Sequence, residues 1–117
     1  MSKIYYLKTC DTCRRILKEL QPDANTALRE IGSFPISPEE VDELCQRSGS
    51  YESLINKRSK LYTAKNLKLQ SLSEADYRGL LLEHYTFLKR PVVVTDTEIF
   101  IGNATKTVAL AKKALHP

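Results

Sequence analysis

Two of the three cysteines in this 117-residue sequence, Cys10 and Cys13, are separated by two residues where a predicted strand passes into a predicted helix. This spacing can bring their α-carbons to about 5.5 Å, which is within disulfide range. At the helix start, unbonded N–H groups and the positive end of the helix dipole lower a thiol pKa from about 8.5 towards neutrality. Positive charges from Lys8, Arg14 and Arg15 favour the same thiolate. We expect Cys10 to be the attacking thiol, and Cys13, on the apolar face, to be the buried resolving thiol.

The same Cys-x-x-Cys spacing is also half of a zinc site, and two inert core cysteines are a further alternative. A structural zinc needs about four ligands. The remaining candidates are Cys45, His84 and His116. Cys45 and His84 fall on apolar faces of predicted helices, so we expect both to be core residues, and His116 is the penultimate residue. The pattern therefore favours a redox or nucleophilic pair, with no metal.

The composition, 42% hydrophobic and 27% charged residues, is that of an ordinary globular protein, and the length suits one domain over residues 1–117. No apolar run approaches the roughly 20 residues of a membrane span, and no signal peptide is visible at the N-terminus. We expect a cytoplasmic protein with no membrane partner. Such a protein has no need of a disulfide framework.

The net charge of +4 is unevenly distributed. The stretch Lys57–Lys68 has five basic residues in twelve and no acid, whereas Glu30–Glu52 has six acids against Arg47. A basic stretch can attract phosphate or an acidic partner, although a solvated surface is the alternative. It lacks the interleaved aromatic residues that stack on bases, so we expect no direct nucleic-acid binding.

Hydrophobic periodicity and turn residues predict the order β-α-β, then three helices, then β-β-α. Pro22 follows the first helix, Ser37-Pro38-Glu39-Glu40 and Ser73-Glu74-Ala75-Asp76 are capping signals, and Asn103 is the expected cap of the last helix. The fold class is therefore α/β. The predicted strands are Ile4–Leu7, Thr26–Ile31, Val92–Thr95 and Glu98–Ile101, and the predicted helices follow Cys10, Ser37, Tyr51, Ser73 and Asn103, the fourth extending to Leu88.

Three ordered motifs, Cys10–Arg14, Leu54–Lys60 and Leu88–Val93, resemble those of the arsenate reductase family, which includes the Spx-type regulators. The resemblance extends from Lys3 to about Leu115. It implies a thioredoxin/glutaredoxin-like fold with a mixed sheet, in which a helical insertion of about residues 37–88 separates βαβ from ββα.

The resemblance also implies roles for individual residues. Cys10 matches the nucleophile, Arg90 precedes a cis-proline at Pro91 packed beside the cysteine loop, and Arg58 supplies another anion-facing arginine. Arg14, which follows Cys13 directly, is a further candidate for anion binding. Arginines near a thiolate can stabilise it and hold an oxyanion through paired N–H donors. No cofactor is expected, and glutathione or a thioredoxin-type dithiol is the expected electron donor.

Two departures from the arsenate-reducing members bear on the reaction. Those members carry another residue at the place of Cys13, and they carry a third arginine where this sequence has Ile101–Ala104. The leading prediction is therefore a thiol–disulfide oxidoreductase that uses Cys10 and Cys13. The alternative is a redox-switched regulator of the Spx type that binds RNA polymerase, with Lys57–Lys68 as a candidate contact. A true arsenate reductase is the third possibility.

Overall fold

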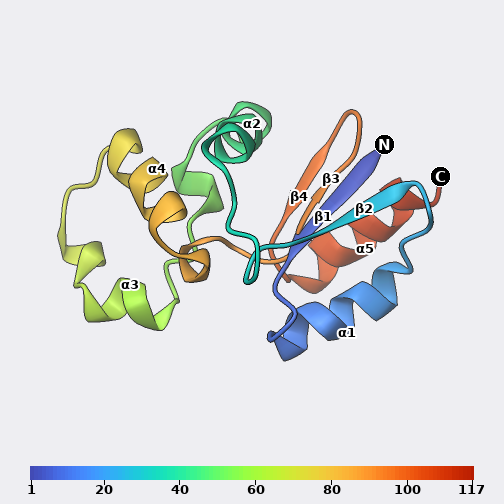
Figure 1. Ribbon diagram of the computed structural model, residues 1–117, viewed down its shortest axis with the longest axis horizontal. Coiled ribbons are helices and arrows are strands. Elements are labelled where there is room, and N and C mark those ends of the chain that lie inside the picture. Colours follow the sequence, from blue (N-terminus) through green and yellow to red (C-terminus); the bar gives the residue numbers. More distant parts are fainter. The chain divides into compact units, whose positions relative to one another are not determined.

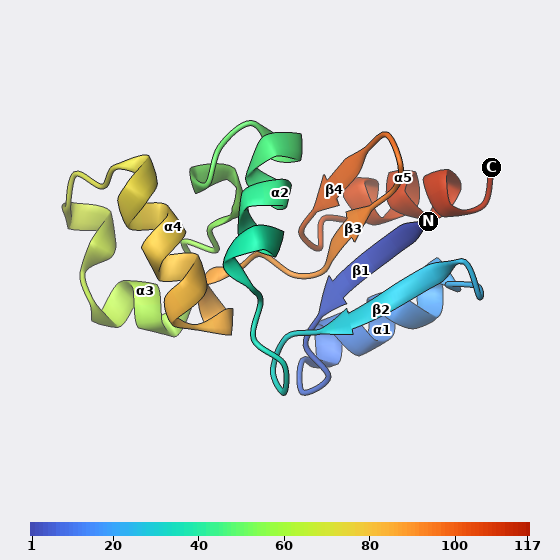
Figure 2. The same cartoon turned by 45° about the horizontal axis from the view of Figure 1, so that its top comes forward.

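The computed structural model describes all 117 residues and divides into two compact units. The sheet unit comprises Met1–Phe34 and Arg90–Pro117, and the helical unit comprises Pro35–Lys89. Figures 1 and 2 show both units from two directions. Each unit is described by itself below.

The sheet unit contains a mixed four-stranded sheet in the order β2-β1-β3-β4. Strand β1 pairs in parallel with β2 and antiparallel with β3, and β3 pairs antiparallel with β4. Ile4 of β1 lies opposite Leu28 on one side and Val93 on the other. The predicted α/β class and mixed sheet are confirmed. The strands are β1 (Ser2–Tyr6), β2 (Thr26–Glu30), β3 (Val92–Val94) and β4 (Ile99–Ile101).

Two helices, α1 (Asp11–Leu20) and α5 (Thr105–Leu115), cover the same face of this sheet (Figure 1). Residues spaced by three or four along each helix point to that face, because this spacing returns to one side of an α-helix. They bury apolar surface against the two central strands, which is the main stabilising term of such a core. The buried cluster consists of Ile4, Ile16, Leu20, Val93, Val108 and Ala111.

Helix α1 follows β1 after a short turn and is bounded at both ends by sequence signals. Cys10 is its N-cap, with extended backbone angles. At the other end Gln21 adopts the left-handed conformation, and Pro22 cannot continue the helix. Cys13 lies on the apolar face of the helix and is buried, whereas Cys10, at the N-cap, is only partly buried.

The helical unit is built from three α-helices and three short 3-10 turns. Its first and last α-helices begin with capping boxes at Ser37 and Ser73, as the sequence predicts. Gly49 ends the first helix in the left-handed conformation that favours glycine. The elements are α2 (Pro38–Ser48), η1 (Glu52–Leu54), α3 (Lys60–Ala64), η2 (Leu67–Leu69), α4 (Glu74–Glu83) and η3 (Tyr85–Phe87). None of the helices in the structure has the length and apolar character needed to cross a membrane.

Several sequence expectations in this unit are wrong. The helix predicted to reach Leu88 ends at Glu83, because His84 has an extended backbone and starts a 3-10 turn. His84 is therefore exposed and is not a core residue. Cys45 is half-buried, since its position at the edge of the apolar face of α2 leaves it partly open. Helix α3 was not expected at all, because its five residues are too few for a periodic pattern.

The expected cap of the last helix is also displaced. Helix α5 has Ala104 as its N-cap, and no side chain bonds the first turn. Asn103 lies one residue too early to take this role. The apolar face of α5 matches the prediction, with Val108 and Ala111 buried and Leu115 packed against the core cluster.

Candidate functional site

Cys10 is held at the start of α1 by the backbone on both sides of it. Its N–H donates to the carbonyl of Leu7 at 3.1 Å, and its carbonyl accepts from the N–H of Arg14 at 3.0 Å. Its Sγ in turn accepts from the N–H of Cys13 at 3.4 Å. The sulfur thus replaces the usual side-chain oxygen of an N-cap, and it sits where the helix presents unbonded N–H groups.

This position makes Cys10 the more acidic of the two thiols. Partial burial acts to raise its pKa, but hydrogen bonds from the backbone and side chain of Cys13 lower it, and so do the charge of Arg90 and the N–H of Thr12. The net pKa is below the ordinary value. A lowered pKa increases the fraction of thiolate, which is the form that attacks disulfides and other electrophiles.

Cys13 has the opposite character. Its side chain is fully buried in the first turn of α1, as expected for a residue of the apolar face. Burial raises its pKa to about 11; its contacts with Cys10 act in the same direction, and a backbone hydrogen bond to Leu7 opposes them. No disulfide joins the two cysteines in the structure. Two neighbouring thiols therefore differ in acidity, with the acidic one nearer the surface.

Arg90 acts on both thiols of this pair although it is distant from them in sequence. Strand β3 pairs with β1, with Val92 opposite Tyr5, so the residues before β3 reach the end of β1 that leads to Cys10. The charge of Arg90 lowers the pKa of both thiols. The Arg90–Pro91 peptide bond is cis, as the resemblance implies. The Pro91 carbonyl accepts from the N–H of Gly102 at 2.9 Å, which connects Pro91 to the residue after β4.

The other predicted arginines are placed differently. Arg14 forms an ion pair with Asp11 and donates from Nη1 to the carbonyl of Lys8 at 2.9 Å. Arg90, rather than a basic residue of the cysteine loop, is therefore the cation that lowers the Cys10 pKa. Arg58 belongs to the helical unit, where its side chain is exposed and its backbone N–H donates to Asn56 Oδ1 at 3.1 Å. Anion binding by Arg14, Arg58 and Arg90 stays a prediction.

Glu30 supports the cysteine loop and was not identified from the sequence. Its carboxylate accepts from the N–H groups of Lys8, Gly32 and Ser33 at 3.1, 2.9 and 2.7 Å. It thereby joins the turn before Cys10 to the turn after β2. Slight burial would raise its pKa, but these N–H donors lower it to about 2. No sequence signal identifies it, because a glutamate at the end of a strand is ordinarily a solvent-exposed surface residue.

The histidines and Cys45 are not part of a metal-binding cluster. No group of three or more His, Cys, Asp and Glu side chains in the described chain is arranged to hold a metal ion. Nε2 of His116 lies 2.8 Å from the carbonyl of Leu20, at the far end of α1. The N–H of Thr86 donates to Nδ1 of His84 within the helical unit.

Comparison with known proteins adds a family to this geometry. The model of the ArsC family matches residues 5–110. The global transcriptional regulator Spx of Bacillus subtilis is 25% identical over 104 residues, which cover 87% of this chain and 79% of the regulator. Spx of Enterococcus faecalis is 28% identical over the same coverage.

Solved structures agree on the fold. The arsenate reductase from Vibrio cholerae matches with a TM-score of 0.76 at 23% identity, covering 94% of this chain and 96% of the reductase. A Staphylococcus aureus protein, SACOL0876, matches with a TM-score of 0.70 at 26% identity, covering 92% and 94%. These matches assign the thioredoxin-like fold of the arsenate reductases to this protein. With the family model matching nearly all of the sequence, the chain belongs to the ArsC family.

Proposed function

We propose that this protein is a thiol–disulfide oxidoreductase in which Cys10 attacks and Cys13 resolves. The observation that carries the proposal is that the pKa values of the two neighbouring thiols are shifted in opposite directions. The pKa of the half-buried Cys10 is lowered, whereas that of the buried Cys13 is raised to about 11. One thiol is thus available as a thiolate while its neighbour stays protonated until the first step is complete.

The reaction begins when the Cys10 thiolate attacks one sulfur of a disulfide substrate. A bond forms between Cys10 Sγ and that sulfur, the substrate S–S bond breaks, and the second sulfur leaves as a thiolate. Cys13 then gives its proton to the released substrate thiolate and attacks Cys10 Sγ. A Cys10–Cys13 disulfide forms, and the first substrate sulfur leaves. Overall, two electrons pass from the cysteine pair to the substrate.

A second exchange restores the reduced pair. Two glutathione thiols, or one dithiol of the thioredoxin type, are oxidised to a disulfide while Cys10 and Cys13 become thiols again. Such donors are abundant in the reducing cytoplasm, which is the compartment we propose for this protein. Burial of Cys13 implies that the donor attacks Cys10, the more accessible sulfur.

Mass mapping after treatment with oxidised glutathione tests this mechanism. The native protein should lose two hydrogen masses and give a peptide pair joined through Cys10 and Cys13. Cys13→Ser should instead accumulate glutathione on Cys10, and Cys10→Ser should react slowly. Cys45→Ser is the matched control and should behave like the native protein. Equal alkylation rates for Cys10 and Cys13, or a disulfide that includes Cys45, would contradict the proposal.

A second candidate function is a redox-switched regulator that binds RNA polymerase. The observation that favours it is the similarity to global transcriptional regulators named Spx in Bacillus subtilis and Enterococcus faecalis. In this case oxidation of the cysteine pair would change the surface that the polymerase contacts. Retention of purified polymerase on the reduced but not the oxidised protein, or the reverse, would support this function. Equal retention in both states, or none, would exclude the switch.

Reduction of arsenate is the third candidate, and it has less support. The segment Ile101–Ala104, at the end of β4, has no arginine to complete an oxyanion clamp. An arsenate-dependent oxidation of glutathione that is lost in Cys10→Ser would establish the activity. We expect no such rate above that of the variant.

A further inference from the structure

The helical unit contains an open groove with a volume of about 410 Å³. One wall is formed by α3 and the other by the residues that follow α4. Small-molecule sites typically have about 300–1,000 Å³, a mostly apolar lining and a few placed polar groups. The groove is lined by Lys60, Leu61, Ala64, His84, Tyr85 and Thr86.

The apolar part of the groove is suited to a flat or branched hydrocarbon group. Leu61 and Ala64 contribute aliphatic surface from consecutive turns of α3. On the opposite side, the rings of His84 and Tyr85 pack together with centroids 4.3 Å apart and planes inclined by 34°. Two adjacent, tilted rings offer an aromatic surface against which the ring of a ligand can pack favourably.

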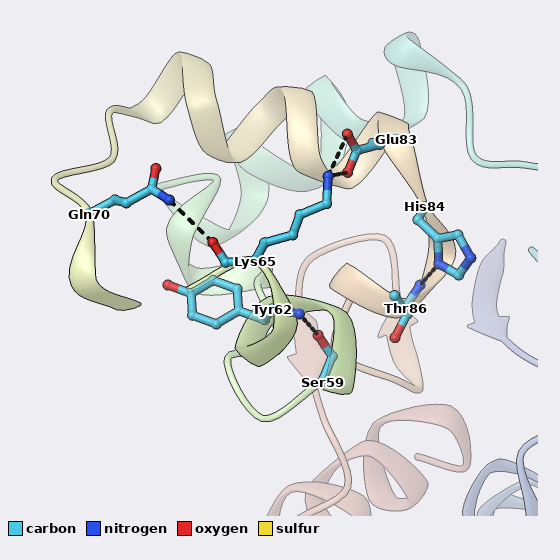
Figure 3. A network of polar contacts seen from close by, with 7 residues as sticks. All are labelled: Ser59, Tyr62, Lys65, Gln70, Glu83, His84 and Thr86. Carbon is cyan, nitrogen blue, oxygen red and sulfur yellow. Dashed lines mark hydrogen bonds and ion pairs between the residues drawn. The ribbon is translucent and has the colours of Figure 1, made fainter. Parts of the chain in front are cut away.

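The polar part of the groove consists of hydrogen-bond donors. The N–H of Thr86 donates to Nδ1 of His84 at 3.1 Å, as Figure 3 shows. Because Nδ1 is the acceptor, the ring proton lies on Nε2, which can donate to a ligand. Lys60 contributes an ammonium group that forms no hydrogen bond or ion pair within the chain.

The surroundings of the groove favour a negative ligand. The nearby acid Glu83 is neutralised, since both of its oxygens accept from Lys65 Nζ, at 3.0 and 3.2 Å (Figure 3). This ion pair also connects the end of α4 to the end of α3. A cation and a neutral N–H donor beside an apolar lining are complementary to an acid with a hydrophobic body.

We propose that this groove binds a small organic carboxylate with an aromatic or branched apolar body. The hydrocarbon body packs on Leu61, Ala64 and the two rings, and the carboxylate accepts from Lys60 and from His84 Nε2. The site lies wholly within the helical unit and uses neither Cys10 nor Cys13. It is therefore an additional binding function, independent of the proposed redox reaction.

Titration with naphthalene-2-carboxylate, followed by ¹H–¹⁵N NMR of the full chain, tests the proposal. We expect saturable shifts confined to the lining residues and their neighbours. Naphthalene-2-carboxamide has the same body without the charge, and we expect it to bind at least about threefold more weakly, as for loss of one exposed charge-assisted contact. Equal affinities, shifts spread over both units or the absence of saturation would overturn the proposal. A site made for a protein segment would give the last result.

A pair of lysine variants distinguishes a direct contact between Lys60 and the ligand from a general effect of positive charge. Lys60→Gln should weaken naphthalene-2-carboxylate about threefold or more. Lys68→Gln removes the same charge from an exposed residue that does not line the groove, and it should leave the affinity nearly unchanged. Both sites are exposed, and the NMR spectrum of each variant reports directly on its fold. Equal weakening by the two substitutions would overturn the assignment of Lys60.

Discussion

At the scale of single residues, two identical side chains acquire different chemistry from their places on one helix. Cys10 is the N-cap, where its sulfur accepts from the N–H of Cys13 and its pKa is lowered. Cys13, three residues later, faces the core and its pKa is raised to about 11. This difference in pKa needs no separate basic residue, because the helix N-terminus lowers the pKa of Cys10 and burial raises that of Cys13.

Substitution of Arg90 tests its electrostatic effect on this pair. Arg90→Gln should raise the Cys10 pKa by less than about one unit, which lowers the fraction of thiolate at pH 7. Alkylation by iodoacetamide at this pH should then be slower by about two- to threefold. The pH dependence of the alkylation rate measures the change. Arg15→Gln, on the exposed side of α1, is the matched control and should leave the curve unchanged. Equal shifts in both variants would show that only net charge matters.

At the scale of elements, side-chain hydrogen bonds to backbone N–H groups stabilise the turn before Cys10 and the start of helix α2. The Glu30 carboxylate joins the turn before Cys10 to the turn after β2. The capping box between Ser37 and Glu40 starts α2 where the chain leaves the sheet unit. Both arrangements satisfy backbone N–H groups that have no partner of their own in a helix or strand.

Glu30 should contribute to stability in a pH-dependent manner. Its pKa is lowered from 4.5 to about 2 in the folded protein, so its contribution is present above about pH 4.5 and is lost as the pH falls towards 2. We expect Glu30→Gln to reduce the free energy of unfolding by about 1 kcal/mol at pH 7, a value kept small by solvent screening. The deficit should shrink below pH 4.5 in urea denaturation.

The control for this measurement is Glu19→Gln on the exposed face of α1, which should show no such pH-dependent deficit. A deficit for Glu30→Gln that persists unchanged at pH 2.5 would mean that its carboxylate is not the source of the stability.

The cap of α2 should be measurable separately. Ser37→Ala removes the oxygen that accepts from the N–H of Glu40 at 3.1 Å. We expect a loss of about 1 kcal/mol in the free energy of unfolding, as for other N-cap serines. Ser71→Ala, at an exposed position outside any helix, should change it little. An equal effect of the two substitutions in chemical denaturation would count against the capping role.

At the scale of the whole molecule, the chain forms a sheet unit interrupted by a helical unit, and only the first carries the cysteine pair. The sheet unit draws its core from both ends of the sequence, since Ile16 of α1 and Val93 of β3 belong to one buried cluster. Consequently the two flanking segments must associate before the pair and Arg90 meet. The description of residues 1–117 as one domain with an insertion stays a prediction.

Disruption of this shared core should destabilise the fold far more than a surface change. Ile16→Ala should lower the free energy of unfolding by about 2–5 kcal/mol, through lost burial and the cavity left behind. Leu28→Ala removes the same number of carbons from an exposed side chain on the edge strand, 52% accessible, and should stay within about 0.5 kcal/mol. Urea denaturation followed by circular dichroism measures both. Comparable losses would contradict the assignment of Ile16 to the core.

Much of the local structure was predictable because its signals are local. The periodicity of Cys13, Ile16 and Leu20 and the caps at Ser37 and Ser73 correctly indicated helices α1, α2 and α4. Helix α3 was missed, and the end of α4 was placed at Leu88 instead of Glu83. Around α3 and after α4, short helices and 3-10 turns bury residues at irregular spacings, so the sequence shows no sustained hydrophobic periodicity there.

The sequence by itself determined which residues could react, because the Cys10–Cys13 spacing, the helix start and the apolar face are properties of one short segment. The tertiary structure alone decided which other groups act on them. Pairing of β3 with β1 brings Arg90 to the thiols, while Arg14 is engaged by Asp11 and Lys8. Electrostatic effects depend on distance in space, and strand pairing sets that distance for residues eighty positions apart along the chain.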